Sequence, residues 1–310
     1  MRLCRFEHEG ASRAGFYDEQ FVIPLSALAD KVGVAISSGD SLLPFLTQGE
    51  ERSKIVELEQ KYDKLSPDER EHLKIPAGKI KLLVPVPNPT KLLLLAGNYS
   101  EHIREGGGHA EERANTFPYV FMKPPLTTLT HPGDPVRIPA VSPNYIDWEL
   151  ELGVIIGRRC SEVSEKNALD YVAGYTVVND ISDRKFKPNP NRVKREKDGF
   201  FDWLHGKWHD TFCPMGPCVL AADELPDPQT LHMTLKVNGE TEQDASTGLM
   251  IFPVAAIIEF ISSYITLEPG DIISTGTPAG VGNAKGKYLH SGDVMEAYIE
   301  KIGTLRNPLK

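Results

Sequence analysis

Cysteine is scarce in this chain, with four residues in 310, and the four are widely scattered. No two of them have the spacing of a redox motif, a haem attachment site or a zinc site. The N-terminus carries charges where a secretion signal needs an apolar core, so no export signal is expected. These absences together predict a cytoplasmic protein with reduced thiols.

Long apolar runs and excess basic charge are also missing. The longest apolar stretch, Gly248 to Leu267, contains Pro253 and Glu259, and its spacing favours an amphipathic helix over a membrane span. The formal net charge is -9, so the chain has no basic surplus with which to bind phosphate backbones. Neither a membrane nor a nucleic acid is therefore an expected partner.

Three common motifs are absent as well. The chain contains no phosphate-binding P-loop, no glycine-rich dinucleotide loop that opens a helix, and no Gly-x-Ser-x-Gly elbow. Nucleotide binding and the simplest serine hydrolase chemistry consequently have little support.

The composition is that of a folded globular chain, with 40% hydrophobic and 25% charged residues. The first 80 or so residues mix strand-like and helical patterns. They end at a proline-rich stretch, Leu83 to Thr90, where a regular helix cannot form. We predict a small N-terminal domain over residues 1–85 and a larger domain over residues 86–310, in which short strands dominate and helices lie at the margins.

Acidic residues gather at two predicted strands. In the segment Asp147 to Ile156, acidic and apolar residues alternate, and the strand period of two places Asp147, Glu149 and Glu151 on one face. A second apolar segment, Tyr171 to Asp180, ends in an acid. Carboxylates inside a fold need water or a cation to stay ionised, so the pair of segments predicts a metal site.

Oxygen ligands favour hard cations, so magnesium is expected first, with manganese or calcium as alternatives and zinc disfavoured. A non-haem iron centre would normally use two histidines and one carboxylate, which makes it a weaker alternative. Alternation of charge alone is explained at least as well by the solvated face of an edge strand.

A second candidate feature is the pair His102 and Glu105, which one helical turn would bring together. The carboxylate would orient the imidazole and raise its basicity, which suits removal of a proton from water. The three glycines of Gly106 to Gly108 could form the hinge of a lid. An exposed turn with an incidental histidine is the simpler alternative.

Two lysines, Lys123 and Lys207, lie at turn-rich segments and could neutralise a carboxylate or an enolate oxygen, although a surface position explains each of them more simply. His205 and His209, close to Lys207, are as readily structural as functional. The loop from Ser274 to Gly282 could point backbone N–H groups and the Thr277 hydroxyl at an anion.

Taken in order, several segments closely resemble the fumarylacetoacetate hydrolase family. They are Gly97-Asn-Tyr with His102 and Glu105, Phe121-Met-Lys-Pro, Asp147-Trp-Glu-Leu-Glu-Leu, Gly174-Tyr-Thr-Val-Val-Asn-Asp and Thr275-Gly-Thr-Pro-Ala-Gly-Val-Gly. The resemblance covers about residues 90 to 310, and bacterial-type members also have a short N-terminal domain. It implies an α+β, β-rich fold, in which a mixed β-sandwich roll carries a small N-terminal α/β domain, and it implies a homodimer.

The resemblance also implies roles for individual residues. Glu149, Glu151 and Asp180 correspond to the metal ligands, for magnesium or manganese. His102 and Glu105 correspond to a catalytic dyad on the lid. The positions that match the family's contacts to substrate are Lys207, which would balance charge in catalysis, Arg184, Thr277 and Lys123.

One stretch departs from the family. After the third ligand, members usually show Ser or Thr, Ala, Arg, Asp and then a Gln, whereas this chain reads Ser182-Asp-Arg-Lys-Phe-Lys187. Lys187 in place of that Gln would add positive charge near the metal, which could favour a more acidic substrate. The basic segment from Lys187 to Lys207 is expected to be a solvated loop.

The resemblance implies a catabolic, metal-dependent enzyme that acts on a small 2-oxo acid. The expected reaction is hydrolysis of a C–C bond, of the acylpyruvate or fumarylacetoacetate type, through a metal-stabilised enolate. Decarboxylation of an oxaloacetate-type acid and isomerisation of 2-hydroxyhepta-2,4-diene-1,7-dioate would use the same site, and family membership alone does not choose among the three. A non-catalytic metabolite-binding protein is the alternative from another class.

Overall fold

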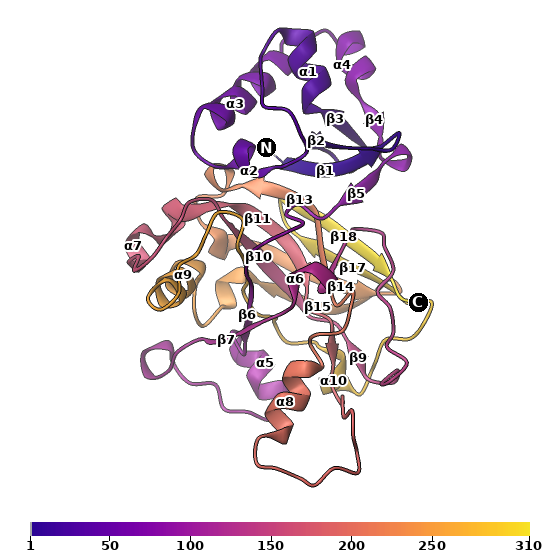
Figure 1. Cartoon of the computed structure of the whole chain (residues 1–310), viewed down its shortest axis with the longest axis vertical. Coiled ribbons are helices and arrows are strands. Elements are labelled where there is room, and N and C mark those ends of the chain that lie inside the picture. Colours follow the sequence, from indigo (N-terminus) through magenta and orange to yellow (C-terminus); the bar gives the residue numbers. More distant parts are fainter. Residues whose placement is uncertain (1) are drawn as a thin grey trace.

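The structure is a computed structural model that describes residues 2–310. Figure 1 shows a small lobe, formed by the N-terminal segment, on a larger body rich in strands. The mixture of elements confirms the predicted α+β, β-rich class. No helix within residues 2–310 combines the length and the apolar character that a membrane crossing requires.

The small lobe is an antiparallel sheet with helices on one side (Figure 1). Its longest helix, α3, packs against α1, which in turn contacts the sheet. The N-terminus of α4 is closed by a capping box in which Ser66 and Glu69 bond each other's backbone N–H groups. The elements are β1 (Arg2–His8), β2 (Ala11–Tyr17), β3 (Phe21–Pro24), α1 (Leu25–Val32), α2 (Leu43–Leu46), α3 (Glu50–Tyr62), α4 (Pro67–Leu73), β4 (Ile75–Pro76) and β5 (Lys81–Leu83).

The larger body contains the rest of a 12-stranded sheet, whose main path runs β4-β3-β2-β1-β13-β11-β10-β16-β6-β7. Strand β10 is central and is buried along its whole length, which agrees with its mostly apolar sequence. The strands of this body are β6 (Leu92–Ala96), β7 (Tyr119–Met122), β8 (Leu129–Thr130), β10 (Leu150–Ile156), β11 (Val172–Asn179), β13 (Cys213–Ala221) and β16 (Ile272–Ser274).

A second, four-stranded sheet packs on the first, as the predicted sandwich requires, and side chains from β10, β11 and β13 meet those of β14, β17 and β18 between the two layers. This interface holds the large apolar core, which includes Trp148, Tyr175 and Met295. The strands of the second sheet are β14 (His232–Val237), β15 (Glu240–Ser246), β17 (Val294–Ile299) and β18 (Gly303–Pro308).

Short helices and a small two-stranded ladder lie at the margins of the body, as the sequence pattern predicts. They are α5 (Ser100–Glu105), α6 (Pro125–Thr128), β9 (Ile146–Asp147), α7 (Glu165–Ala168), β12 (Ser182–Asp183), α8 (Asp198–His205), α9 (Val254–Ser262) and α10 (Gly282–Lys285). The apolar stretch from Gly248 to Leu267 contains α9, which begins directly after Pro253.

The predicted domain boundary at residue 85 falls between β5 and β6, in a stretch without helix or strand. Strand β1 of the small lobe nevertheless pairs with β13 of the body, with Arg2 opposite Leu220 and Leu3 opposite Val219. Backbone hydrogen bonds therefore join the lobe to the body, and the division into two domains stays a prediction.

Candidate metal centre and lid

The three acids predicted to bind metal converge in the larger body. Glu149, Glu151 and Asp180 each offer a carboxylate oxygen, and these oxygens all lie within 4.8 Å of one another. Asp180 directly follows β11, which pairs with β10 so that Asn179 lies opposite Leu150. The alternative of a solvated edge strand is wrong, because β10 has β11 on one side and β16 on the other and the acids are almost completely buried.

The charge state of the cluster fits a bound cation. Burial, together with the charges of Asp180 and Glu149, raises the pKa of Glu151 well above its usual value. One carboxylate oxygen of Glu151, Oε1, is buried without a hydrogen-bond partner. An unpaired buried oxygen among converging carboxylates is the donor set that a hard divalent cation prefers, so the residues present fit such an ion.

Backbone and hydroxyl groups from neighbouring segments orient the acids. The other oxygen of Glu151, Oε2, accepts hydrogen bonds from the Ser274 hydroxyl at 2.5 Å and from the Gly276 N–H at 2.9 Å. The backbone N–H of Glu149 donates to Oδ1 of Asn179 at 3.0 Å. Neither Ser274 nor Asn179 is predicted as a site residue from the sequence, although Ser274 begins the loop of residues 274–282 and Asn179 directly precedes Asp180.

Two buried lysines face the cluster. The ammonium of Lys207 lies 2.6 Å from both Glu149 Oε2 and Asp180 Oδ2. Burial alone would lower the pKa of Lys207, but the charges of Asp180 and Glu149 outweigh it, and the pKa is raised. Lys123 lies 2.5 Å from Asp180 Oδ1 and also donates to the carbonyl oxygens of Ile181 and Phe212. The simpler expectation of two surface lysines is wrong, since Lys207 is 3% exposed and Lys123 is 1% exposed.

Arg184 is the third cation that contacts the acids. Its Nη2 lies 2.6 Å from Glu149 Oε1, and its Nε donates to Asp147 Oδ2 at 2.7 Å. Burial would raise the pKa of Glu149, but the positive charges of Arg184 and Lys207 hold the pKa below its usual range. Arg184 therefore contacts one of the three converging acids directly.

Asp147 does not belong to the cluster, so the expected continuous strand from Asp147 to Ile156 is wrong. Strand β9 ends at Asp147 and β10 begins at Leu150, so Trp148 and Glu149 lie outside both strands. The Asp147 carboxylate instead accepts hydrogen bonds from the N–H groups of Gly282 at 2.7 Å and Asn283 at 2.9 Å. A strand break changes the face to which every earlier residue points, which periodicity alone could not reveal.

The predicted dyad forms on α5. His102 Nδ1 lies 2.8 Å from Glu105 Oε1, and the other oxygen of Glu105 accepts the Gly280 N–H at 2.8 Å. Burial would raise the pKa of Glu105, but the hydrogen bonds from His102 and Gly280 together lower it. Both side chains are 19% exposed, so the pair is not an exposed turn.

Thr277 lies in the loop that orients Glu151, next to Gly276. Its side chain is buried, and its hydroxyl accepts a hydrogen bond from Gln243 Nε2 at 2.8 Å. Gln243 also accepts the backbone N–H of Leu150 at 3.0 Å, so it links this loop to the start of β10. Gln243 was missed because it lies on β15, whose polar sequence, Glu240–Ser246, gives no strand or site signal.

The first part of the basic segment, residues 187–197, is mostly exposed. Lys187 is exposed, outside the buried cluster. The expectation of a loop throughout residues 187–207 is wrong, because α8 forms within it, and Arg192 pairs with Asp198 and Asp202 beside that helix. Part of the basic charge is thus neutralised locally.

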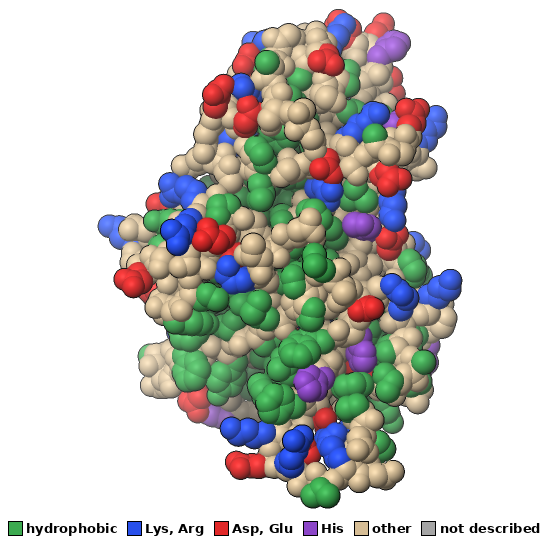
Figure 2. Space-filling view, viewed as in Figure 1, with side chains coloured by type: hydrophobic (Ala, Val, Ile, Leu, Met, Phe, Trp, Pro, Cys, Tyr) green, Lys and Arg blue, Asp and Glu red, His purple; other side chains and the backbone are tan. Residues whose placement is uncertain are grey.

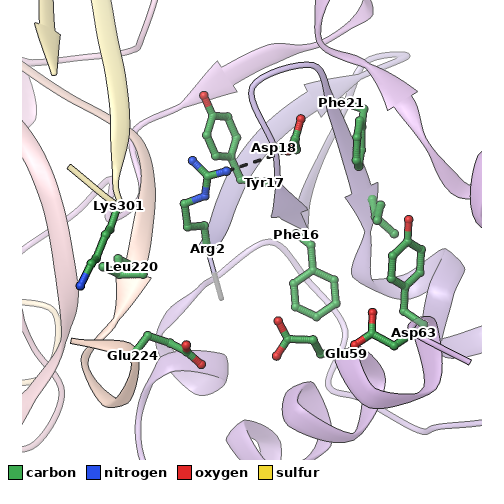
Figure 3. A pocket seen from close by; sticks show the side chains of 12 residues that line it. Arg2, Phe16, Tyr17, Asp18, Phe21, Glu59, Asp63, Leu220, Glu224 and Lys301 are labelled. Carbon is green, nitrogen blue, oxygen red and sulfur yellow. Dashed lines mark ion pairs between the residues drawn. The ribbon is translucent and has the colours of Figure 1, made fainter. Parts of the chain in front are cut away.

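A separate cavity of about 520 Å³ lies where the small lobe meets the body (Figure 3). Arg2 and Phe16 from the lobe face Leu220 and Lys301 from the body across it. None of the acids of the cluster lines this cavity. It is therefore distinct from the candidate metal centre.

Comparisons with known proteins match the chain to one family. Residues 91–310 match the family described as fumarylacetoacetate (FAA) hydrolase C-terminal. The chain is 39% identical over 319 residues to 2,4-didehydro-3-deoxy-L-rhamnonate hydrolase of Sphingomonas sp. (strain SKA58), which covers 99% of this chain and 95% of that protein. It is 40% identical over 235 residues to oxaloacetate tautomerase YisK of Bacillus subtilis (strain 168), which covers 75% of this chain and 74% of that protein.

Solved structures of similar proteins extend over the whole chain. Fumarylacetoacetate hydrolase from psychrophilic Exiguobacterium antarcticum has a TM-score of 0.77 at 30% identity and covers 100% of this chain and 99% of its own. Maleylpyruvate hydrolase from Sphingobium sp. SYK-6, in complex with manganese(II) ion and pyruvate, has a TM-score of 0.73 at 29% identity and covers 100% and 98%. These likenesses confirm the expected fold.

Proposed function

Because the chain belongs to the fumarylacetoacetate hydrolase family, we propose that it is a divalent-metal-dependent enzyme that hydrolyses a carbon–carbon bond in a small 2-oxo acid. The observation that carries the proposal is the buried convergence of Glu149, Glu151 and Asp180. Homologues that share this family are hydrolases, isomerases and tautomerases. The choice among these reactions depends on further features of this chain.

We assign the substrate to the 2,4-dioxo acids, the acylpyruvate class. The relative that matches nearly the full length is a hydrolase, and its substrate name describes oxo groups at carbons 2 and 4 with no hydroxyl at carbon 3. Hydrolysis of such an acid between carbons 3 and 4 yields pyruvate and a second carboxylic acid. The maleylpyruvate hydrolase that shares the fold is described in complex with manganese(II) ion and pyruvate, which agrees with this product.

The charge of the site suits an anionic substrate. The cluster of three converging acids contacts three cations, Lys123, Arg184 and Lys207. With all six groups ionised the set is neutral, and a divalent cation would leave two positive charges. The carboxylate and the enolate oxygen of one 2-oxo acid would balance them.

Glu149, Glu151 and Asp180 would hold the cation, with magnesium or manganese preferred and calcium as a weaker choice. When bound, the cation would supply Lewis-acid stabilisation of the negative charge that develops on the 2-oxo oxygen. We infer that Lys207 balances charge beside the same acids. The ammonium of Lys123 donates to three oxygens, so no N–H remains for a substrate. We therefore propose that Lys123 orients Asp180, in place of the expected contact with substrate.

The lid dyad would activate water. With its Nδ1 proton directed at Glu105, His102 has a free Nε2 lone pair that can take a proton from the water attacking carbon 4. The bond between carbons 3 and 4 then breaks, and carbon 3 takes up a proton. Arg184, which contacts Glu149, and Thr277, which follows the residue that donates to Glu151, are proposed to contact substrate oxygens.

Oxaloacetate-type chemistry is the second candidate, because YisK is named an oxaloacetate tautomerase. Tautomerisation, decarboxylation and isomerisation of an unsaturated dioate all lack the attack of water on a second carbonyl. They would use the acid cluster but would place less demand on His102. A non-catalytic metabolite-binding protein would show no turnover at all.

We also propose that two copies of the chain associate. Figure 2 shows hydrophobic side chains gathered on the lower half of the face in view, over the region of β7, α8 and α9. They line a mainly apolar cavity of about 570 Å³, and Phe117, Tyr119, Phe200 and Tyr264 there are more than half exposed. Exposed aromatic surface of this kind is typical of a protein interface. A cytoplasmic location and a catabolic role remain predictions.

A substrate panel tests the proposed function. The purified chain, supplied with magnesium or manganese, is assayed with 2,4-dioxo acids, oxaloacetate and unsaturated 2-oxo dioates. We expect release of pyruvate from 2,4-dioxo acids, lost on addition of a chelator. Turnover of oxaloacetate alone would favour the second candidate, and binding of every acid without turnover would favour the non-catalytic alternative.

A further inference from the structure

Asp183 and His209 form a buried polar pair that the proposed chemistry does not use. Asp183 Oδ2 and His209 Nε2 lie 3.4 Å apart, and neither atom has a hydrogen-bond partner. The Asp183 side chain is fully buried and the His209 side chain is 16% exposed.

The surroundings of the pair are apolar. The His209 ring contacts Phe186 and Phe212 edge to face, with ring centroids 4.9 Å and 5.0 Å away. The second Asp183 oxygen accepts only a long hydrogen bond, 3.3 Å, from the Lys185 N–H. A buried carboxylate in such a place is unfavourable without a partner, and apolar residues of similar size would fill the space at lower cost. Stability of the fold therefore does not explain why two polar groups lie here.

The pair connects two segments that carry groups of the metal centre. Asp183 follows Asp180 by three residues, and His209 follows Lys207 by two. The backbone joins the same segments twice, through Ile181 N–H to Phe212 O at 3.1 Å and through Asp183 N–H to Gly206 O at 2.9 Å. Lys207 thus lies between these two links, with its ammonium against Glu149 and Asp180.

We propose that Asp183 and His209 are positioning residues, which hold the turn that carries Lys207 against the acid cluster. The backbone links fix the ends of the turn but not its side-chain direction. The His209 imidazole contacts two aromatic rings, and its Nε2 faces the buried Asp183 carboxylate. These contacts hold the His209 side chain in one position, and the turn with it. The pair acts on Lys207 within the site of the proposed function, on which this inference rests.

The test measures the accessibility of Lys207 and needs no turnover. The purified protein is treated with an amine-reactive ester, and the rate of modification at each lysine is followed by mass spectrometry. We compare the wild type with Asp183→Ala, His209→Phe, the double variant and His209→Gln. Lys123, buried and held by three oxygens, is the internal control, and His205→Phe is the matched control variant on the same turn.

We expect Lys207 to be modified about tenfold faster in Asp183→Ala, in His209→Phe and in the double variant, which is within the range of coupling measured in shared polar networks. Modification of Lys123 should not change. His209→Gln, whose amide N–H can still reach Asp183, should restore the wild-type rate, and His205→Phe should leave it unaltered. Because the double variant leaves no unpaired buried group, it is the variant most certain to fold.

Two results would overturn the inference. The first is an unchanged rate at Lys207 in all variants. The second is wild-type protection in the double variant alone, which would mean that the two groups only satisfy each other. Failure of the proposed function is a different result, in which the wild type turns over no substrate while the modification pattern still changes as expected.

Discussion

At the scale of single residues, the site depends on the hydrogen-bond and ion-pair partners of each buried acid. Glu149 faces Arg184 and Lys207, and its pKa is lowered. Glu151 has one oxygen bonded to Ser274 and Gly276 and the other without a partner, and its pKa is raised. Glu151 is therefore the acid that gains most from a bound cation.

His102 provides a residue-scale prediction. In His102→Ala, kcat for a 2,4-dioxo acid should fall about 100-fold or more, because the general base is lost, while the affinity for manganese should stay the same. Steady-state kinetics and a manganese titration check both expectations. The control is His109→Ala, which removes an exposed histidine from the loop after α5. An unaltered kcat in His102→Ala would show that this residue does not activate water.

The sequence identified the converging acids because strand alternation and a terminal acid are local patterns. Glu149, Glu151 and Asp180 could be found in this way. Asn179 and Ser274, which orient them, could not, because a side chain that bonds a distant acid leaves no periodic signal. Asp147 has the right spacing but turns away where the strand breaks.

At the scale of elements, helix α5 is connected to the loop of residues 276–282 through Glu105, which accepts the Gly280 N–H. The same loop donates the Gly276 N–H to Glu151. Helix α5 and the candidate metal ligand Glu151 are therefore connected through one loop. A positive φ at Gly276 and at Gly280 allows the sharp turns that this loop needs.

This contact predicts a pH effect. Since the pKa of Glu105 is lowered in the folded state, the contact stabilises the position of α5 against the loop at pH values above 4.5, the ordinary glutamate pKa. That stabilisation is lost as pH falls through the folded-state pKa. Hydrogen exchange of the Gly280 amide, corrected for intrinsic rates, should show protection at neutral pH and loss of protection in acid. In Glu105→Gln the Gly280 amide should show the weaker protection at both pH values. Equal protection in the wild type and the variant at neutral pH would contradict the role of the ionised carboxylate.

The turn after α8 gives a second prediction at this scale. A Cβ added at Gly206 would come within 2.4 Å of the Asp183 carbonyl oxygen, so Gly206→Ala must push two segments apart. We expect a loss of about 1–3 kcal/mol in the free energy of unfolding. Gly199→Ala, in α8 where the added Cβ meets nothing within 4 Å, should instead stabilise by about 0.5–1 kcal/mol. Urea unfolding compares the two, and equal effects would contradict the close packing.

Element prediction succeeded where alternation or β-branching marks a strand. Apolar and β-branched runs predict strands over residues 119–122, 232–237 and 294–299, and β7, β14 and β17 have these bounds. No strand is predicted at β13 from the sequence, because Pro214, Gly216 and Pro217 are typical of turns. Tertiary pairing with β1, β8 and β11 overrides that local preference.

At the scale of the whole molecule, the fold places the metal centre where separate segments meet. Strand order puts β10 between β11 and β16, which are far apart in the sequence. The two sheets then enclose the core beneath the acids. No local pattern predicts this order, which is why the family resemblance, rather than periodicity, supplied the sandwich.

Association of two chains is a prediction for the whole molecule. Tyr119 is 64% exposed in the aromatic surface, so Tyr119→Asp should leave the fold intact and raise the dimer dissociation constant about tenfold or more. Val141→Asp, at a residue equally exposed but outside that cavity, is the matched control. Sedimentation velocity over a range of concentrations measures both. A wild type that is monomeric at every concentration would contradict the proposed association.

The measurement that tests the central claim most directly is a titration of the purified protein with manganese, followed by electron paramagnetic resonance of the free ion. We predict one bound ion per chain, with Glu151→Gln weakening its affinity about 100-fold or more, since even partners outside the ligand shell contribute 10–100-fold. Glu196→Gln, at an exposed acid, should bind as the wild type does. Absence of binding in the wild type, or full affinity in Glu151→Gln, would contradict the assignment of Glu149, Glu151 and Asp180 as a metal centre.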